Sequence, residues 1–66
     1  MGNVMNFDTN AAAVYLGVSP SYLEKLRVAG GGPTFIRVGR RVVYRQSDLD
    51  RFLDERAVRS TSEANP

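Results

Sequence analysis

The chain has 66 residues and a formal net charge of +2, and it contains neither cysteine nor histidine. A chain of this length forms one domain with a small core, so a deep, water-excluding substrate pocket is hard to build from it. Without cysteine and histidine it lacks disulfides, the usual zinc ligands and the commonest nucleophile–base pairs. No apolar run approaches the roughly 20 residues of a membrane span. We therefore expect no enzyme, cofactor, metal site, small-molecule ligand or membrane partner.

The basic residues are concentrated in one part of the sequence. Residues 25–45 hold six of the nine basic residues and no acid, whereas residues 46–66 hold five of the seven acids. An acid-free basic block inside a folded domain is typical of a surface that binds a polyanion. A surface that is merely solvated and basic is the alternative. The block consists of Lys25, Arg27, Arg37, Arg40, Arg41 and Arg45.

A first short helix is predicted from Asp8 to Leu16. The carboxylate of Asp8 can accept the unpaired amide protons of the first turn. Ala12 and Leu16 then fall on one stripe at helical spacing. Gly17 suits the left-handed position that ends a helix, so the helix stops there.

A second helix follows after the short connection "GVS". Ser19 can cap it and Pro20 fits its first position, where a missing N–H costs nothing. The helix covers "PSYLEKLRVA", turns Leu23 and Leu26 inward, and ends at Gly30. Two short helices joined through such a turn are the helix-turn-helix arrangement, although many helical hairpins use the same turn chemistry.

The segment "IRVGRRVVYR", residues 36–45, is predicted to form a β-hairpin. A two-residue Gly39–Arg40 loop would pair Val38 with Arg41 and mix arginines into both faces. A longer loop would pair Val38 with Val42 and leave the arginine pair at the tip. Because a small domain needs all of its apolar surface, we expect the longer loop. It gathers four apolar residues on one face, namely Ile36, Val38, Val42 and Tyr44.

A third helix is predicted to start near Ser47, where "SDLD" offers a serine cap with an acid three residues on. Leu49, Phe52 and Leu53 form a stripe that would lie over the apolar face of the hairpin. The predicted fold is mainly α with a two-stranded β-hairpin. Its boundaries are residues 7–56, with flexible termini at 1–6 and 57–66.

The order of these elements carries a resemblance to a known family. The stretches "AAAVYLGVSPSYLEKLR" and "GGGPTFIRVGRRVVYRQSDLDRFL" resemble the excisionase-type branch of the winged helix-turn-helix proteins, which is related to the MerR-like DNA-binding domains. The resemblance implies a MerR-like winged helix-turn-helix, with the hairpin as its wing. It places Gly17–Ser19 at the turn, Pro33 at the opening of the wing and Gly39–Arg41 at its tip.

The sequence departs from the family's pattern at four positions, which are Ala11, Val14, Leu26 and Val43. Val43 removes a basic residue from the outer face of the wing. Together with Val14 and Phe35 it could form an apolar surface for a partner. Alternatively, the three are isolated exposed apolar residues of an ordinary kind.

The resemblance also implies a function. Such a protein is a recombination directionality factor, which binds adjacent sites near attachment DNA, bends the duplex and helps a site-specific integrase to excise a mobile element. The implied partners are double-stranded DNA, the integrase and further protomers side by side on the DNA. The expected location is the bacterial cytoplasm, at the nucleoid. A small transcription regulator of a phage or mobile element is a second interpretation, and a basic protein-interaction module is a third.

The second helix supplies the first group of candidate DNA contacts, because its N-terminal part enters the major groove in a helix-turn-helix. Ser21, Tyr22 and Lys25 lie on or beside its outward face and are candidates for base-edge or phosphate contacts. Tyr22 could instead be a partly buried core residue. Glu24 could accept a hydrogen bond from cytosine, or pair with Arg27 one turn on.

The wing supplies the second group. Arg40 and Arg41 at a hairpin tip can reach the minor groove or straddle phosphates, with Arg37 in support. Arg45 could do the same or pair with a neighbouring acid, Asp48 or Asp50. The complete candidate DNA-binding set is Ser21, Tyr22, Lys25, Arg27, Arg37, Arg40, Arg41 and Arg45.

Overall fold

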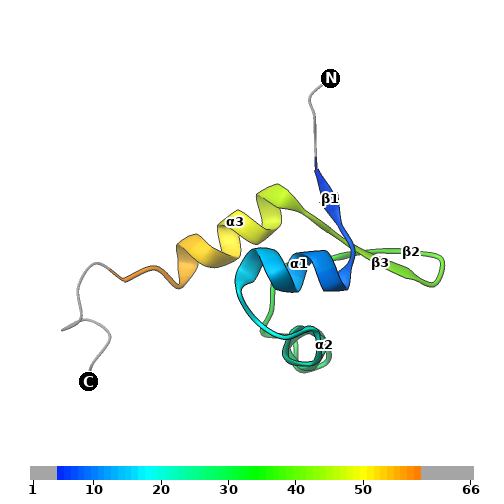
Figure 1. The fold of residues 1–66 in the computed structure, drawn as a ribbon, viewed down its shortest axis with the longest axis horizontal. Helices are drawn as coiled ribbons and strands as arrows, with labels where there is room; N and C mark the ends of the chain where they lie inside the picture. The colour runs from blue at the N-terminus through cyan, green and yellow to red at the C-terminus, as the bar shows by residue number, and fades with distance from the viewer. Residues whose placement is uncertain (1–4, 59–66) are drawn as a thin grey trace.

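The computed structural model describes residues 5–58, and Figure 1 shows their arrangement. The chain forms β1 (Asn6–Phe7), α1 (Thr9–Leu16), α2 (Pro20–Ala29), β2 (Ile36–Val38), β3 (Arg41–Arg45) and α3 (Gln46–Glu55). The mainly α domain with an antiparallel hairpin is confirmed. The expected flexible termini fall mostly outside the described residues, and Asn6 lies in β1.

Both helices of the predicted helix-turn-helix form as the capping signals indicate. The Asp8 carboxylate accepts a 2.8 Å hydrogen bond from the backbone N–H of Ala11. Gly17 ends α1 with a φ of 79°, a conformation that glycine adopts without strain. The Ser19 hydroxyl oxygen accepts a hydrogen bond from the backbone N–H of Tyr22 and caps α2. The turn between the helices is therefore determined by local chemistry.

Five fully buried side chains form the core, and α1 lies at its centre. Ala12 and Ala13 of α1 are small, so α1 packs closely against α2, α3 and the sheet. Leu23 from α2, Tyr44 from β3 and Leu49 from α3 complete the buried cluster. Each helix thus contributes to one shared core.

The sheet has three strands in the order β1-β3-β2, not the predicted two. The added strand β1 pairs with β3, so that Phe7 lies opposite Tyr44. Its backbone ladder extends past β3, because the N–H of Gln46 donates a 3.0 Å hydrogen bond to the Met5 carbonyl oxygen. Two residues are too short a segment for alternation to reveal a strand, so the sequence gives no signal for β1.

The register predicted for the hairpin is wrong. Val38 pairs with Arg41 and Ile36 pairs with Val43, which leaves Gly39 and Arg40 as a two-residue turn. Gly39 has a φ of 59°. Within residues 5–58 a positive φ occurs only at glycines. A glycine at the first central position fits the type II′ turn, whose twist matches the flanking strands. The turn chemistry therefore outweighs the apolar pattern.

This register divides the apolar residues of the wing between its two faces. Val42 and Tyr44 pack toward the core, where Phe7 and Phe35 join them instead of the predicted partners from β2. Because the core receives two phenylalanines from outside the hairpin, it does not need the whole apolar set on one face. The opposite face of the wing carries Ile36, Val38 and Val43.

The predicted cap of the third helix is also wrong. α3 follows β3 without a loop, and its N-cap is Arg45, which makes no capping hydrogen bond with its side chain. The strand pairing holds the chain extended up to Arg45, so the helix starts before Ser47 can cap it. Leu49 is buried and Phe52 is half-buried as predicted, whereas Leu53 is 39% exposed.

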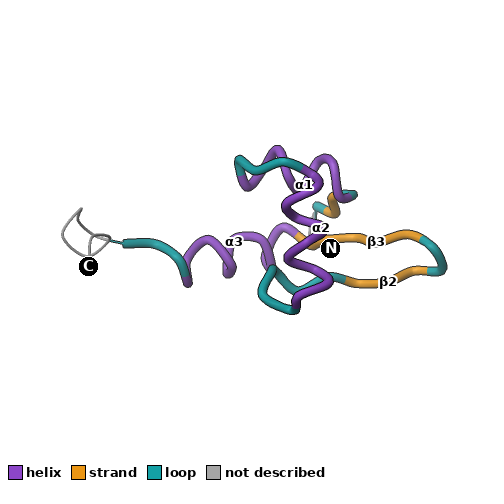
Figure 2. Tube along the Cα trace, turned by 90° about the horizontal axis from the view of Figure 1, so that it is seen from below, coloured by secondary structure: helices purple, strands orange, loops and turns teal. Residues whose placement is uncertain are grey.

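The hairpin projects away from the helices, as Figure 2 shows. We call the hairpin of residues 36–45 the wing. In the same view α3 extends to the opposite side of the molecule. The wing tip is thus free to contact a large ligand.

Candidate nucleic-acid interface

The exposed face of α2 carries the predicted outward residues. Ser21, Glu24, Lys25 and Val28 are all exposed, and they line one shallow hollow on the helix surface. Leu23 lies on the opposite side of the helix and is fully buried, which fixes this orientation. A 10-residue helix with one inward stripe leaves this whole face to solvent.

Tyr22 is 50% exposed, so the alternative in which it belongs to the core is wrong. Its position beside the Ser19 cap places it in the first turn of α2. In a helix-turn-helix this end of the second helix approaches the bases. The ring is therefore available for a contact outside the domain.

The wing exposes three arginines. Arg37 lies in β2, Arg40 in the turn and Arg41 at the start of β3, and all three are exposed. Within residues 5–58 the single ion pair joins Arg45 to Asp48. No carboxylate in that range therefore lies in direct contact with the other three guanidinium groups, and their charge faces solvent.

Arg45 is different, because its Nε donates a 2.9 Å hydrogen bond to the Asp48 carboxylate. The Asp48 side chain is 12% exposed, whereas that of Arg45 is 46% exposed. The alternative that paired Arg45 with a neighbouring acid is thus confirmed. The pair connects the end of β3 to the first turn of α3, where an acidic residue also suits the helix dipole.

α2 and the wing border a common groove of about 300 Å³. Glu24 from α2 and Arg41 from β3 both line it, together with Asp8, Thr9 and Asn10 at the start of α1. Glu24 also lines the hollow on the exposed face of α2. The exposed face of the helix therefore continues into the groove beside the wing as one surface.

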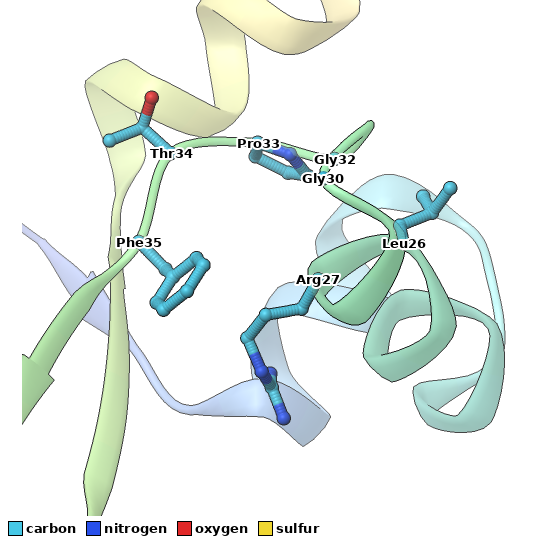
Figure 3. Close-up of a pocket in the computed structure, with 7 residues that line it drawn as sticks. All are labelled: Leu26, Arg27, Gly30, Gly32, Pro33, Thr34 and Phe35. Atoms are coloured by element: carbon cyan, nitrogen blue, oxygen red, sulfur yellow. The ribbon is translucent and has the colours of Figure 1, made fainter.

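Arg27 does not line this groove, because its side chain turns toward the core. Its Nη1 donates hydrogen bonds to the Tyr44 hydroxyl at 2.9 Å and to the Thr9 hydroxyl at 3.3 Å. Its guanidinium carbon also lies 5.8 Å from the centre of the Phe35 ring. Figure 3 shows that the side chains of Arg27 and Phe35 extend into the same space, from α2 and from the segment before β2. They line an open pocket of about 290 Å³.

This placement settles the alternative role of Glu24. The predicted Glu24–Arg27 pair is wrong, because the guanidinium of Arg27 turns toward the core and is occupied there. Phe35 likewise packs against the core, while Val14 lies exposed on α1. The suggested apolar surface of Val14, Phe35 and Val43 therefore does not form as one patch.

Two contacts that hold the helices in place join residues far apart in the sequence, so local sequence patterns do not predict them. The Tyr15 hydroxyl of α1 donates a hydrogen bond to the Asp50 carboxylate of α3. The Arg56 guanidinium lies 4.3 Å from the centre of the Phe52 ring and donates to the Gly31 carbonyl oxygen at 3.1 Å. The bond between Arg27 and Tyr44 has one general signal, because the hydroxyl of a buried tyrosine needs a hydrogen-bond partner.

Comparison with known proteins identifies the family. Residues 7–57 match a family of helix-turn-helix domains. The chain belongs to this helix-turn-helix family. The family includes excisionase-like DNA-binding proteins and is typically non-enzymatic, and membership of it indicates binding to double-stranded DNA. A search of curated proteins finds no match.

No helix within residues 5–58 is long and apolar enough to cross a membrane. Over the same residues no three side chains of histidine, cysteine, aspartate or glutamate gather as a metal site. The surface shared by α2 and the wing is the candidate nucleic-acid interface.

Proposed function

We propose that this helix-turn-helix protein binds attachment-site DNA as an excisionase, a recombination directionality factor that promotes integrase-mediated excision of a mobile element. It would act in the bacterial cytoplasm, on the nucleoid. One observation carries the DNA-binding part of the proposal. The exposed face of α2 continues into the groove lined by Glu24 and Arg41, so a helix and a basic wing present one surface to a duplex.

In this mode of binding the N-terminal half of α2 enters the major groove. Ser21, Tyr22 and Lys25 then face base edges or the flanking phosphates. A lysine can hydrogen-bond the acceptors of guanine, whereas serine discriminates little between bases. Lys25 therefore carries most of the sequence preference in this proposal.

The wing would grip the backbone beside the same groove. Arg40 and Arg41 reach phosphates or the minor groove, with Arg37 on the neighbouring strand. Their exposure and their lack of a carboxylate partner within residues 5–58 support this role. The acids Asp8 and Glu24 lie in the groove between helix and wing, and they would disfavour a phosphate there. Phosphate contacts are thereby directed to the wing tip.

The proposed role requires binding and bending and no chemistry by the protein itself. Contacts in two adjacent grooves by so small a domain suit protomers that bind side by side and together bend the duplex. The integrase supplies the strand exchange. The resemblance of the chain to excisionase-type proteins supports this assignment over a general DNA-binding role.

Footprinting and an excision assay on attachment-region DNA test the proposal. The protein should protect several adjacent sites and raise integrase-mediated excision, and Arg40→Ala with Arg41→Ala should remove both effects. Protection confined to a promoter, without any effect on excision, would contradict the directionality role. That result would favour the second candidate, a small transcription regulator that uses the same surface. Binding indifferent to DNA sequence and lost at modest salt would instead favour an acidic protein partner.

A further inference from the structure

We infer that Arg27 and Tyr44 act as a positioning pair that fixes the angle between α2 and the wing, and hence the distance between the two DNA segments that they contact. The inference rests on the proposed DNA binding and deepens it. It assigns Arg27 an internal role in place of the DNA contact expected from the sequence.

The covalent link between α2 and the wing is held at its start, where the N–H groups of Gly30 and Gly31 donate to the Leu26 carbonyl oxygen, but these local contacts do not by themselves fix the angle between the two elements. The link begins with three consecutive glycines, residues 30–32, and glycine restricts the backbone least of all residues. Of the helices and strands, α1 is the element against which α2 packs most extensively. The angle between α2 and the wing therefore depends on α1, on the core that Leu23 and Tyr44 share, and on side-chain bridges.

Arg27 is such a bridge, since its single planar group joins α2 to α1, to β3 and to the segment before β2. It donates to Tyr44 of β3 at 2.9 Å and to Thr9 at the start of α1 at 3.3 Å. Its face lies near the Phe35 ring, just before β2. The Tyr44 side chain is fully buried, so its hydroxyl is a rigid anchor for the guanidinium.

The same contacts keep Arg27 away from DNA. A move to a phosphate would break both hydrogen bonds and leave the hydroxyl of Tyr44 without its partner. An unpaired buried polar group is costly, and hydrogen bonds from a charged donor are among the stronger ones. The exposed Arg37, on the neighbouring strand, gives up no such bonds and serves as the matched comparison.

Loss of the bridge would let α2 and the wing adopt several relative angles. Only part of the population would then have the geometry that fits the DNA, and the apparent affinity would fall by that fraction. The protein would also tolerate DNA in which the two contacted segments are further apart or closer together. A lost phosphate contact would also weaken binding, but it would leave the spacing preference unchanged and reduce the salt dependence.

The experiment measures binding of the full-length protein to its footprinted site and to the same site with one base pair inserted or deleted between the two contacted segments. Arg27→Met retains the apolar stem, and Tyr44→Phe removes only the hydroxyl. Each should weaken binding to the unaltered site by about tenfold. Each should flatten the preference for the native spacing and leave the salt dependence unchanged. The double variant should bind no more weakly than Arg27→Met alone, because Arg27→Met already removes the bond to Tyr44.

The control is Arg37→Met. It should retain the spacing preference and reduce the slope of log affinity against log salt by about 0.9, the value for one phosphate contact. If Arg27→Met shows that slope change while Tyr44→Phe binds as the wild type does, Arg27 contacts a phosphate and the inference is overturned.

Two further outcomes are decisive. Variants that only melt at lower temperature, and keep wild-type affinity and spacing preference while folded, would overturn the inference alone. A wild-type protein without any sequence preference would overturn the proposed function and this inference with it. Tyr44→Phe preserves the buried ring, so it provides the test even where Arg27→Met fails to fold.

Discussion

A Cβ atom placed on Gly32 would lie 2.9 Å from the Cβ of Leu26. Real Cβ atoms do not approach another heavy atom so closely, so the loop after α2 lies against its last turns only because residue 32 is glycine. The same loop leads into the wing. The contact between Gly32 and Leu26 therefore helps to set where the wing begins.

Gly32→Ala should consequently destabilise the domain. Displacing either the loop or the helix to relieve the clash is an overpacking cost of about 1–3 kcal/mol. Urea denaturation measures it as a lower free energy of unfolding. Gly31→Ala is the matched control, since a Cβ there meets nothing within 4 Å. Equal stability of the two variants would show that the loop lies elsewhere.

Asp8→Ala should lower the free energy of unfolding by about 1 kcal/mol, because the variant loses the side-chain cap of α1. Ser47→Ala should leave it within about 0.5 kcal/mol of the wild type, because Ser47 does not cap α3. Thermal or urea unfolding compares the two. A larger loss of stability in Ser47→Ala than in Asp8→Ala would show that Ser47 caps α3, as the sequence predicted.

Tyr15 gives the domain a pH dependence in alkaline solution. Its hydrogen bond to Asp50, desolvation and the negative charge of that carboxylate raise the pKa of Tyr15 above 10.0. The folded state thus holds the phenol proton more tightly than the unfolded state does. The resulting stability is complete below pH 10 and is lost as pH rises through the folded pKa.

Tyr15→Phe should therefore reduce stability at neutral pH and flatten its decline above pH 10. Urea denaturation between pH 8 and about pH 11 follows both effects. Tyr22→Phe is the control, because Tyr22 is half exposed and lies outside this contact. A parallel alkaline decline in wild type and Tyr15→Phe would exclude the Tyr15–Asp50 bond as its cause.

Arg40→Ala combined with Arg41→Ala should reduce the slope of log affinity against log salt by about 1.8, because each phosphate contact contributes about 0.9. Arg45→Ala should leave that slope unchanged, since Arg45 is paired with Asp48. Its free energy of unfolding should fall by about 1–3 kcal/mol, because the Asp48 side chain is 12% exposed and loses its partner. An unchanged slope in the double variant would remove the wing from the interface.

Lys25→Ala should relax the preference for one base position in the site, by about 1–3 kcal/mol of discrimination. Selection from a randomised DNA pool, followed by affinity measurements on single-base variants, resolves this. A uniform loss of affinity across all sequences would instead identify Lys25 as a phosphate contact.

The helix-turn-helix could be predicted from the sequence because its signals are local. Asp8 and Ser19 cap helices through backbone amides three residues away, and Gly17 supplies a positive φ. These interactions involve only neighbouring residues, so they do not depend on the remainder of the fold. The outward face of α2 follows from the same reasoning, since helical periodicity relates it to Leu23.

The strand register of the wing could not be predicted from the apolar pattern. Its register followed the glycine at the first position of the turn, and the apolar set divided because Phe7 and Phe35 supplied the core from elsewhere. Arg27 is one of six bases in the basic block of the sequence, and nothing local distinguishes it from Arg37. Only the approach of Tyr44 and Thr9 from other elements does so.

The sequence by itself thus determined the helices, the turn and the presence of a basic hairpin, through caps, glycines and charge within a few residues of one another. The tertiary structure decided which arginines are free for a ligand and which hold the domain together. The reason is physical. The hydrogen-bond partners around a guanidinium determine whether it can bind a ligand. Partners distant in the chain become neighbours only when the core forms.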